Sequence, residues 1–252
     1  MGKDPYLSVI IPAYNEKGNF ESGALEKVWQ YLKARKYTWE VILVDDGSSD
    51  GSLELFRDYC SHKPNFYLVA NVHMGKAGTV AKGIEKASGK YLLFADFDQA
   101  TPLSEFEKLQ PYLEAGYEVV IGSREVAGAR REKEPFYRHL MGRGFNYGVR
   151  LLTVRGIADT QCGFKAFEQQ AAKKLFRSLR VYQPTQINAA FTGAFDVEVL
   201  FLAKKFGFKI AEVPIHWRHV KTTRVNPLKD SILMASHVFK IRLYDLLGLY
   251  ER

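Results

Sequence analysis

The chain has 252 residues, of which 46% are hydrophobic and 25% charged, and its formal net charge is +8. This length and composition fit one large α/β domain or two small ones with a sizeable core. No window approaches roughly 18 consecutive apolar residues, and no apolar signal region lies near the start, so we expect neither a membrane-spanning helix nor a secretory signal.

The basic balance favours a polyanionic partner, namely nucleic acid, an anionic membrane or a phosphorylated substrate, although solubility alone would also explain it. The two cysteines, Cys60 and Cys162, lie far apart and show neither metal-binding nor redox spacing. We therefore expect a reducing, cytosolic setting.

Apolar runs of strand length alternate with helical patterns along the first half of the chain. Strands are expected at residues 7–12, 39–44, 66–70, 91–94 and 117–122. Between the first two, Leu25, Val28 and Leu32 recur at helical spacing. This alternation predicts an α/β fold with a mostly parallel central sheet, right-handed crossovers and helices on both faces.

Polar and acidic side chains follow the first, second and fourth of these strands. They are Tyr14, Asn15 and Glu16, then Asp45 and Asp46, and finally Asp96 and Asp98. In a parallel sheet these three loops meet at one edge, where ligands of open α/β sheets bind. Acidic residues at strand ends also serve as turn formers or caps, so it is the convergence that favours a site. The Asp-x-Asp pair suits a hard divalent cation that also takes substrate phosphates.

Two common nucleotide-binding motifs are missing from this edge. No G-x-G-x-x-G pattern follows the first strand, which argues against a nicotinamide dehydrogenase. Gly75 and Lys76 do not complete a P-loop, because Ala70 and Ala77 occupy the positions that need glycine and Ser or Thr.

Three stretches, Ser8–Glu16, Val44–Gly51 and Asp96–Asp98, resemble the family 2 glycosyltransferases, which have a nucleotide-sugar-binding α/β fold called GT-A. The resemblance covers roughly residues 7–220. It implies a nucleotide-sugar site made of Pro12, Tyr14, Glu16, Asp45, Asp46, Gly47, Lys76 and Asp96.

Within that implied site, the resemblance gives Asp45 a hydrogen bond to the base and Asp96 a contact to the nucleoside. It gives Asp98 the role of holding Mg²⁺ or Mn²⁺ on the diphosphate of a UDP- or GDP-linked donor, where the cation neutralises charge on the leaving group. Gln99 directly follows Asp98. Its carbonyl is a second candidate metal ligand, and a turn residue is an equal interpretation.

The stretch Asp159–Phe167 resembles a segment of the dolichyl-phosphate glucosyltransferase subgroup and its bacterial and archaeal relatives. Residues 195–198 and 212–217 resemble the same subgroup. The chain departs from its pattern at His216, where asparagine is usual, and at Arg224, where a lysine is usual. Trp217, beside the first departure, is equally a substrate contact or a packed side chain.

Residues 124–150 contain six arginines, which suit phosphate oxygens, although a solvated basic face is the alternative for most of them. A lipid monophosphate is largely an oxyanion at neutral pH and needs no strong base, only cations that bring two anions together. The candidates are Arg124, Arg131, Arg138 and Lys165. If the acceptor were a hydroxyl, a base would be needed, and Asp159 is the first candidate. A structural turn or cap is the alternative for Asp159.

We expect a GT-A domain over residues 1–225 and an amphipathic helical segment over residues 226–252, opened by Pro227. That helix could lie in a membrane interface or pack on protein. The expected function is metal-dependent, inverting transfer of a hexose or related sugar from a nucleotide sugar to a polyprenyl or dolichyl phosphate, at the cytosolic face of a membrane and without nucleic acid. The alternatives are transfer to a sugar or protein hydroxyl, and a non-catalytic nucleotide-sugar-binding protein.

Overall fold

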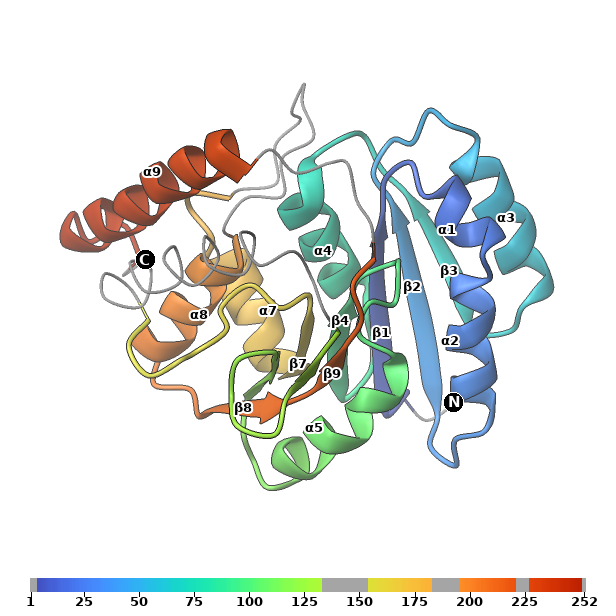
Figure 1. Cartoon of the computed structure of the whole chain (residues 1–252), viewed down its shortest axis with the longest axis horizontal. Helices are drawn as coiled ribbons and strands as arrows, with labels where there is room; N and C mark the ends of the chain where they lie inside the picture. Colours follow the sequence, from blue (N-terminus) through green and yellow to red (C-terminus); the bar gives the residue numbers. More distant parts are fainter. Residues whose placement is uncertain (1–3, 133–153, 183–194, 221–226, 251–252) are drawn as a thin grey trace.

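The structure is a computed structural model that describes residues 4–132, 154–182, 195–220 and 227–250. A seven-stranded sheet forms its centre, with the strand order β3-β2-β1-β4-β7-β5-β8 (Figure 1). All strands of this sheet run parallel except β7, which is antiparallel to both of its neighbours. The strands are β1 (Leu7–Ala13), β2 (Trp39–Asp45), β3 (Phe66–Ala70), β4 (Tyr91–Ala95), β5 (Val119–Ser123), β7 (Phe164–Glu168) and β8 (Ile210–Pro214).

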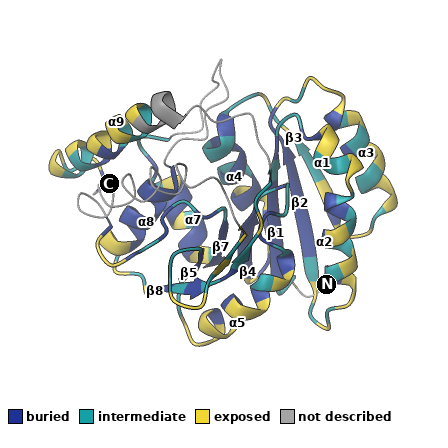
Figure 2. Ribbon diagram, in the orientation of Figure 1, coloured by how far each residue is buried: buried dark blue, intermediate teal, exposed yellow. Residues whose placement is uncertain are grey.

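Helices cover both faces of the sheet, so each face has its own hydrophobic core. One core is completed by α2 (Ala24–Lys33), α3 (Ser52–His62) and α5 (Phe106–Glu114), with the short α1 (Lys17–Glu21) and the 3₁₀ turn η1 (Leu103–Glu105) beside them. The other is completed by α4 (Gly75–Lys86), α7 (Gln169–Arg177), α8 (Phe195–Lys205) and α9 (Pro227–Leu246). Burial deepens toward the central strands, as Figure 2 shows.

The fold confirms the predicted mostly parallel sheet with helices on both faces. The parallel pairs β1–β2 and β1–β4 bring the loops that follow strands β1, β2 and β4 to one edge, the carboxyl edge. The antiparallel strand β7, inserted between β4 and β5, was not foreseen.

A second, two-stranded ribbon lies beside the carboxyl edge. It pairs β6 (Arg130–Arg131) with β9 (His216–Trp217) in parallel, with Arg131 opposite Trp217 in the register. Backbone hydrogen bonds from Arg130 N–H to the Ile215 carbonyl (3.0 Å) and from Glu132 N–H to the Trp217 carbonyl (3.1 Å) hold the ribbon together. The ribbon therefore brings residues that are distant in the sequence to the ends of β5 and β8.

Helix α9 begins at Pro227, as predicted. Its buried side chains Val238 and Ile241, together with Tyr250 beyond its end, belong to the same core as α4, α7 and α8. The Tyr250 hydroxyl donates to the buried Glu198 carboxylate (2.7 Å). The proposed division into residues 1–225 and 226–252 stays a prediction. No helix within the described residues is long and apolar enough to cross a membrane.

Candidate active site

The loops after β1 and β2 are joined by hydrogen bonds at the carboxyl edge. Asp46 N–H donates to the Ala13 carbonyl (2.8 Å), and the Asn15 carboxamide oxygen accepts from Ser49 N–H (2.8 Å). Glu16 N–H donates to the Ser52 hydroxyl (2.9 Å), and the Glu16 carboxylate accepts from the Asn19 amide (2.5 Å). The predicted meeting of the first two loops is therefore a direct contact.

Asp45, at the end of β2, has a buried carboxylate whose two oxygens differ. Oδ2 accepts from the N–H groups of Gly47 and Ser48, both at 3.1 Å. Oδ1 has no hydrogen-bond partner among the described residues. A buried carboxylate oxygen without a donor is costly. Asp45 thus has one oxygen available to accept a hydrogen bond from a ligand, and its bond to the base stays a prediction.

Asp46 has a different task from its neighbour. Its carboxylate accepts from the N–H groups of Met74 (2.8 Å) and Gly75 (2.9 Å) and contacts His73 Nδ1 (2.8 Å). The Tyr14 ring stacks on the His73 ring with centroids 4.4 Å apart. Asp46 therefore fixes the start of α4 and holds the imidazole on which Tyr14 rests.

Two further predicted residues shape the same wall. Gly47 adopts a φ of +74°, and a Cβ there would lie 3.1 Å from His73 N, so this turn favours glycine. Pro12 lies in β1 opposite Val44 of β2 in the register and is half-buried. Gly47 contacts the Asp45 carboxylate through its N–H, and Pro12 lies one position before the strand ends, in the part of the edge predicted to receive the nucleotide.

Lys76, in the first turn of α4, reaches across the edge to the third loop. Its ammonium lies 2.6 Å from Asp96 Oδ1. Burial lowers the pKa of Lys76, but the carboxylates of Asp96, Asp196 and Asp98 raise it by more. The pKa therefore lies above its usual value, and the ammonium stays charged. Asp96 in turn sits against Gly163, where an added Cβ would lie 1.9 Å from Asp96 Oδ2. Gly163 is thus required for the position of the Asp96 carboxylate.

Asp98 and Gln99 form the turn after Asp96. Asp98 Oδ1 accepts from Ala100 N–H (2.9 Å), and no described residue donates to Oδ2. Burial and the neighbouring Asp96 carboxylate raise the pKa of Asp98. Gln99 has a φ of +52°, and its Nε2 donates to the Asp96 carbonyl (2.9 Å), which leaves its side-chain oxygen available. Gln99 therefore combines the turn role with an unused carbonyl.

The metal prediction can be compared with these donors. Among the described residues, no group of three or more His, Cys, Asp or Glu side chains could hold a metal ion by itself. Mg²⁺ sites in phosphate-handling proteins commonly use one or two carboxylates and take further oxygens from substrate phosphates and water. Asp98 with the Gln99 carbonyl fits such a partial donor set.

Arg124, after β5, is bound to Asp159 by three hydrogen bonds. Its Nε and Nη2 donate to the two carboxylate oxygens (2.7 and 2.9 Å), and its backbone N–H donates to Oδ2 (3.0 Å). Burial raises the pKa of Asp159, but the guanidinium outweighs this and holds that pKa below its usual range. Asp159 has no exposed surface. This placement argues against Asp159 as a general base and makes it the residue that orients Arg124.

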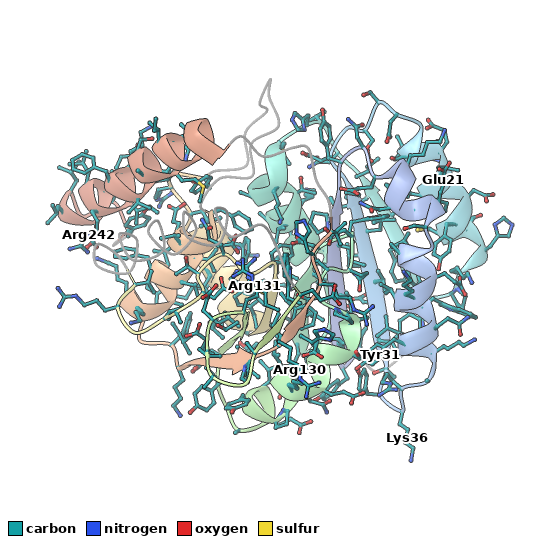
Figure 3. The ribbon with its side chains drawn as sticks, in the orientation of Figure 1. Glu21, Tyr31, Lys36, Arg130, Arg131 and Arg242 are labelled. Atoms are coloured by element: carbon teal, nitrogen blue, oxygen red, sulfur yellow. The ribbon has the colours of Figure 1, made fainter. Side chains whose placement is uncertain are left out.

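Trp217 connects two of the predicted cations. The guanidinium carbons of Arg124 and Arg131 lie 5.6 and 5.4 Å from its ring centroid. Arg131 also pairs with Glu125 (2.5 Å). In Figure 3 the labelled Arg131 lies toward the middle of the molecule, and Arg130 lies below it. Arg131 and Arg124 thus come together at one aromatic ring, whereas Arg138 lies outside the described residues.

Lys165 is placed differently from the prediction. It lies in β7 with an exposed fraction of 1%, and its ammonium donates to the Cys162 carbonyl and to Asp196 Oδ1 (2.6 Å). A buried ammonium with these partners does not reach an acceptor directly. The geometry assigns Lys165 to anchoring the start of α8 next to the site.

Several residues that position the site were given no definite role from sequence. Asp196 pairs with Lys165. The Glu212 carboxylate accepts hydrogen bonds from the N–H groups of Ala158 and Asp159, both at 2.8 Å. Both carboxylates lie in stretches quoted for their resemblance, which was the available signal. Their partners are distant in the sequence, so only the fold reveals what each one does.

A model of the family described as Glycosyl transferase family 2 matches residues 8–176. The chain belongs to glycosyl transferase family 2. The dolichyl-phosphate beta-glucosyltransferase of Dictyostelium discoideum is 35% identical to it, over 98% of this chain and 76% of the relative. The human protein of the same name is 34% identical, over 97% of this chain and 77% of the relative. The family membership confirms the resemblance stated from the three acidic stretches.

Among solved structures, the mannosyl-3-phosphoglycerate synthase of Rubrobacter xylanophilus superimposes with a TM-score of 0.66 at 15% identity, covering 97% of this chain and 75% of that one. Identity this low shows the fold alone. It confirms the GT-A type of architecture for this family 2 glycosyltransferase.

Proposed function

We propose that this glycosyltransferase moves glucose or a related hexose from a UDP- or GDP-linked donor to a polyprenyl or dolichyl phosphate. The observation that carries the proposal is the division of the carboxyl edge into an acidic half and a cationic half. Asp45, Asp96 and Asp98 lie at the ends of β2 and β4, and Arg124 and Arg131 meet at Trp217. The names of the relatives from Dictyostelium and human support the choice of acceptor and sugar.

The acidic half receives the donor in this proposal. Asp45 Oδ1 accepts one hydrogen bond from the base, because that buried oxygen has no partner among the described residues. Lys76 stays cationic and lies at the start of α4, where a diphosphate also meets the positive end of the helix dipole. Asp98, with Gln99, would hold Mg²⁺ or Mn²⁺. When bound, that cation supplies charge neutralisation on the leaving nucleoside diphosphate.

The cationic half receives the acceptor phosphate. Asp159 fixes the Arg124 guanidinium through both carboxylate oxygens, and the Trp217 ring lies within about 6 Å of both arginines, a distance typical of cation–π contacts. Arginine presents its donors in a plane that matches phosphate oxygens. A lipid phosphate already carries the attacking oxyanion, so orientation replaces a general base. The buried, low-pKa Asp159 agrees with a reaction that needs no base there.

Replacement of Asp98 with asparagine tests the donor half. We expect transfer to fall by about a thousandfold, because a neutral amide lacks the negative charge with which the Asp98 carboxylate would hold the divalent cation. The measurement is transfer of radiolabel from UDP-glucose or GDP-linked sugars into organic-extractable polyprenyl phosphate, with Mg²⁺ or Mn²⁺ present. Asp58→Asn, an exposed aspartate on α3, is the control. Unchanged transfer in the Asp98 variant would contradict the metal role, and label in soluble sugars instead of lipid would contradict the acceptor.

We also propose that α9 contacts the cytosolic face of a membrane. Ile232 (68%), Phe239 (68%) and Leu246 (78%) are exposed on α9 and share one side of the helix, because they are spaced seven residues apart. Figure 2 shows exposed residues along α9. Leu243 and Leu247 continue that side, and the exposed Lys240 supplies a cation beside it. An apolar side of this kind with flanking cations suits an anionic interface. The unpaired thiols of Cys60 and Cys162 agree with a cytosolic setting.

Vesicle flotation tests this contact. The protein is mixed with vesicles of phosphatidylcholine containing phosphatidylserine, and we expect Phe239→Ser with Leu246→Ser to reduce the floating fraction several-fold. The control is Tyr67→Ser with Val72→Ser, which removes two exposed apolar side chains at and just beyond β3. Equal flotation of both variants and the unaltered protein would contradict the proposed role of α9.

A further inference from the structure

A groove of about 770 Å³ lies between α4 and α7, on the sheet face opposite α2, α3 and α5. Figure 1 shows these two helices next to each other, with α9 beyond them. The groove uses none of the charged side chains assigned above to donor or acceptor. Its lining residues are Asn71, Met74, Gly78, Ala81, Lys82, Ile84, Glu85, Lys173, Phe176, Arg177, Leu179 and Arg180.

The floor of the groove is apolar. Met74 and Ile84 come from the α4 side, and Phe176 and Leu179 from α7 and the residues that follow it. Gly78 and Ala81 lie between Met74 and Ile84 along the same helix face and are too small to fill the space. The groove can therefore bury an apolar chain, at a gain of about 25 cal/mol for each Å² removed from water.

The rim of the groove is strongly cationic, with four basic side chains and one carboxylate among the lining residues. Lys82 pairs with Glu85 (2.9 Å), and that contact lowers the pKa of Glu85. Neither Lys173 nor Arg177 lies within ion-pair distance of a carboxylate among the described residues. Arg177 acts on the Glu85 carboxylate only from beyond ion-pair distance, so both cations on the α7 side can receive an anion.

We propose that this groove binds an anionic phospholipid of the membrane, with its phosphate against Lys173 and Arg177 and one acyl chain on the apolar floor. The choice of ligand follows from the combination of floor and rim, because a free anion would leave the floor uncovered and a neutral chain would leave Lys173 and Arg177 without an ion-pair partner among the described residues. A phosphate carries the oxygens that a guanidinium and an ammonium bind best.

The position of the groove also favours a membrane lipid. At the rim, Arg180 Nε donates to the Leu249 carbonyl (3.2 Å), and Leu246, Leu247 and Leu249 are exposed at that end of the chain. Arg180 therefore links the rim of the groove to the end of the chain that carries these exposed leucines, and the lipid proposal depends on the proposed membrane contact of α9. At its other end, Met74 N–H donates to Asp46 (2.8 Å), so a bound lipid would touch the wall of the donor site.

The test uses monomeric dihexanoyl phosphatidic acid, which needs no bilayer, and measures its binding by titration calorimetry. We expect it to bind at least about tenfold more tightly than inorganic phosphate or dihexanoyl phosphatidylcholine, because only it satisfies both floor and rim. Lys173→Gln with Arg177→Gln should weaken this binding by about tenfold or more. Ala81→Phe, which fills the floor and leaves the cations in place, should weaken it as well.

The matched control is Lys86→Gln with Lys174→Gln, which removes the same charge from α4 and α7 at positions that do not line the groove. We expect its binding to equal that of the unaltered protein. Equal weakening in the control, or equal affinity for phosphatidic acid and inorganic phosphate, would overturn the proposal. Because the probe is monomeric, loss of vesicle flotation with intact binding would contradict only the α9 contact, and radiolabel transfer reports separately on the proposed reaction.

Discussion

Two buried aspartates stand at opposite halves of the carboxyl edge and differ in what they can offer a ligand. Asp45, after β2, has one oxygen held by two backbone N–H groups and one without a partner among the described residues. Asp159, at the β5 side, gives both oxygens to Arg124. The comparison teaches that burial alone does not mark a ligand-binding carboxylate. Unused hydrogen-bonding capacity marks such a carboxylate. On the β5 side, that capacity belongs to Arg124 and not to Asp159.

Removal of the charge on Asp159 is the strongest way to test this difference. We expect Asp159→Asn to lower the free energy of unfolding by roughly 3 kcal/mol, because it leaves the largely buried Arg124 guanidinium without its counter-charge. The measurement is urea denaturation followed by circular dichroism.

Asp45→Asn is the matched control for that variant, since it makes the same change in the other buried carboxylate. We expect it to change stability by less and to raise the KM for the nucleotide sugar by about tenfold, because the lost acceptor faces the ligand. Equal destabilisation by the two variants would mean that both carboxylates serve the fold alike.

Acid titration sharpens the same comparison with a smaller effect. The folded-state pKa of Asp159 lies below its unfolded value of about 3.9. The stabilisation is therefore fully present above that unfolded value and is lost as the pH falls through the folded-state pKa. We expect the difference in unfolding free energy between the unaltered protein and Asp159→Asn to be constant from about pH 7 to about pH 5 and to shrink below about pH 4. A difference that does not change with pH would show that shape, not charge, couples Asp159 to the fold.

The two halves also differ in how much of them the sequence could predict. In the acidic half, each site residue follows its strand directly, so the apolar runs ending at Asp45 and Asp96 predict both the sheet and the edge. In the cationic half, Arg124 and Asp159 are 35 residues apart, and Lys165 and Asp196 are 31 apart. Those pairs depend on strand β7 running antiparallel between β4 and β5, which no local pattern indicates. Lys165 was therefore predicted to meet the acceptor although it is buried.

The smallest expected effect concerns the contact through which the second half supports the first. Gly163 precedes β7, and a Cβ on it would lie 1.9 Å from Asp96 Oδ2. Gly163→Ala must therefore displace the Asp96 carboxylate and weaken its 2.6 Å contact with Lys76. We expect kcat/KM for the nucleotide sugar to fall by about tenfold, the scale of one misplaced charged contact, with the overall fold retained. Gly18→Ala on α1, where an added Cβ meets nothing within 4 Å, is the control. If both variants kept full activity, the position of Asp96 would not depend on β7, and the two halves would function independently.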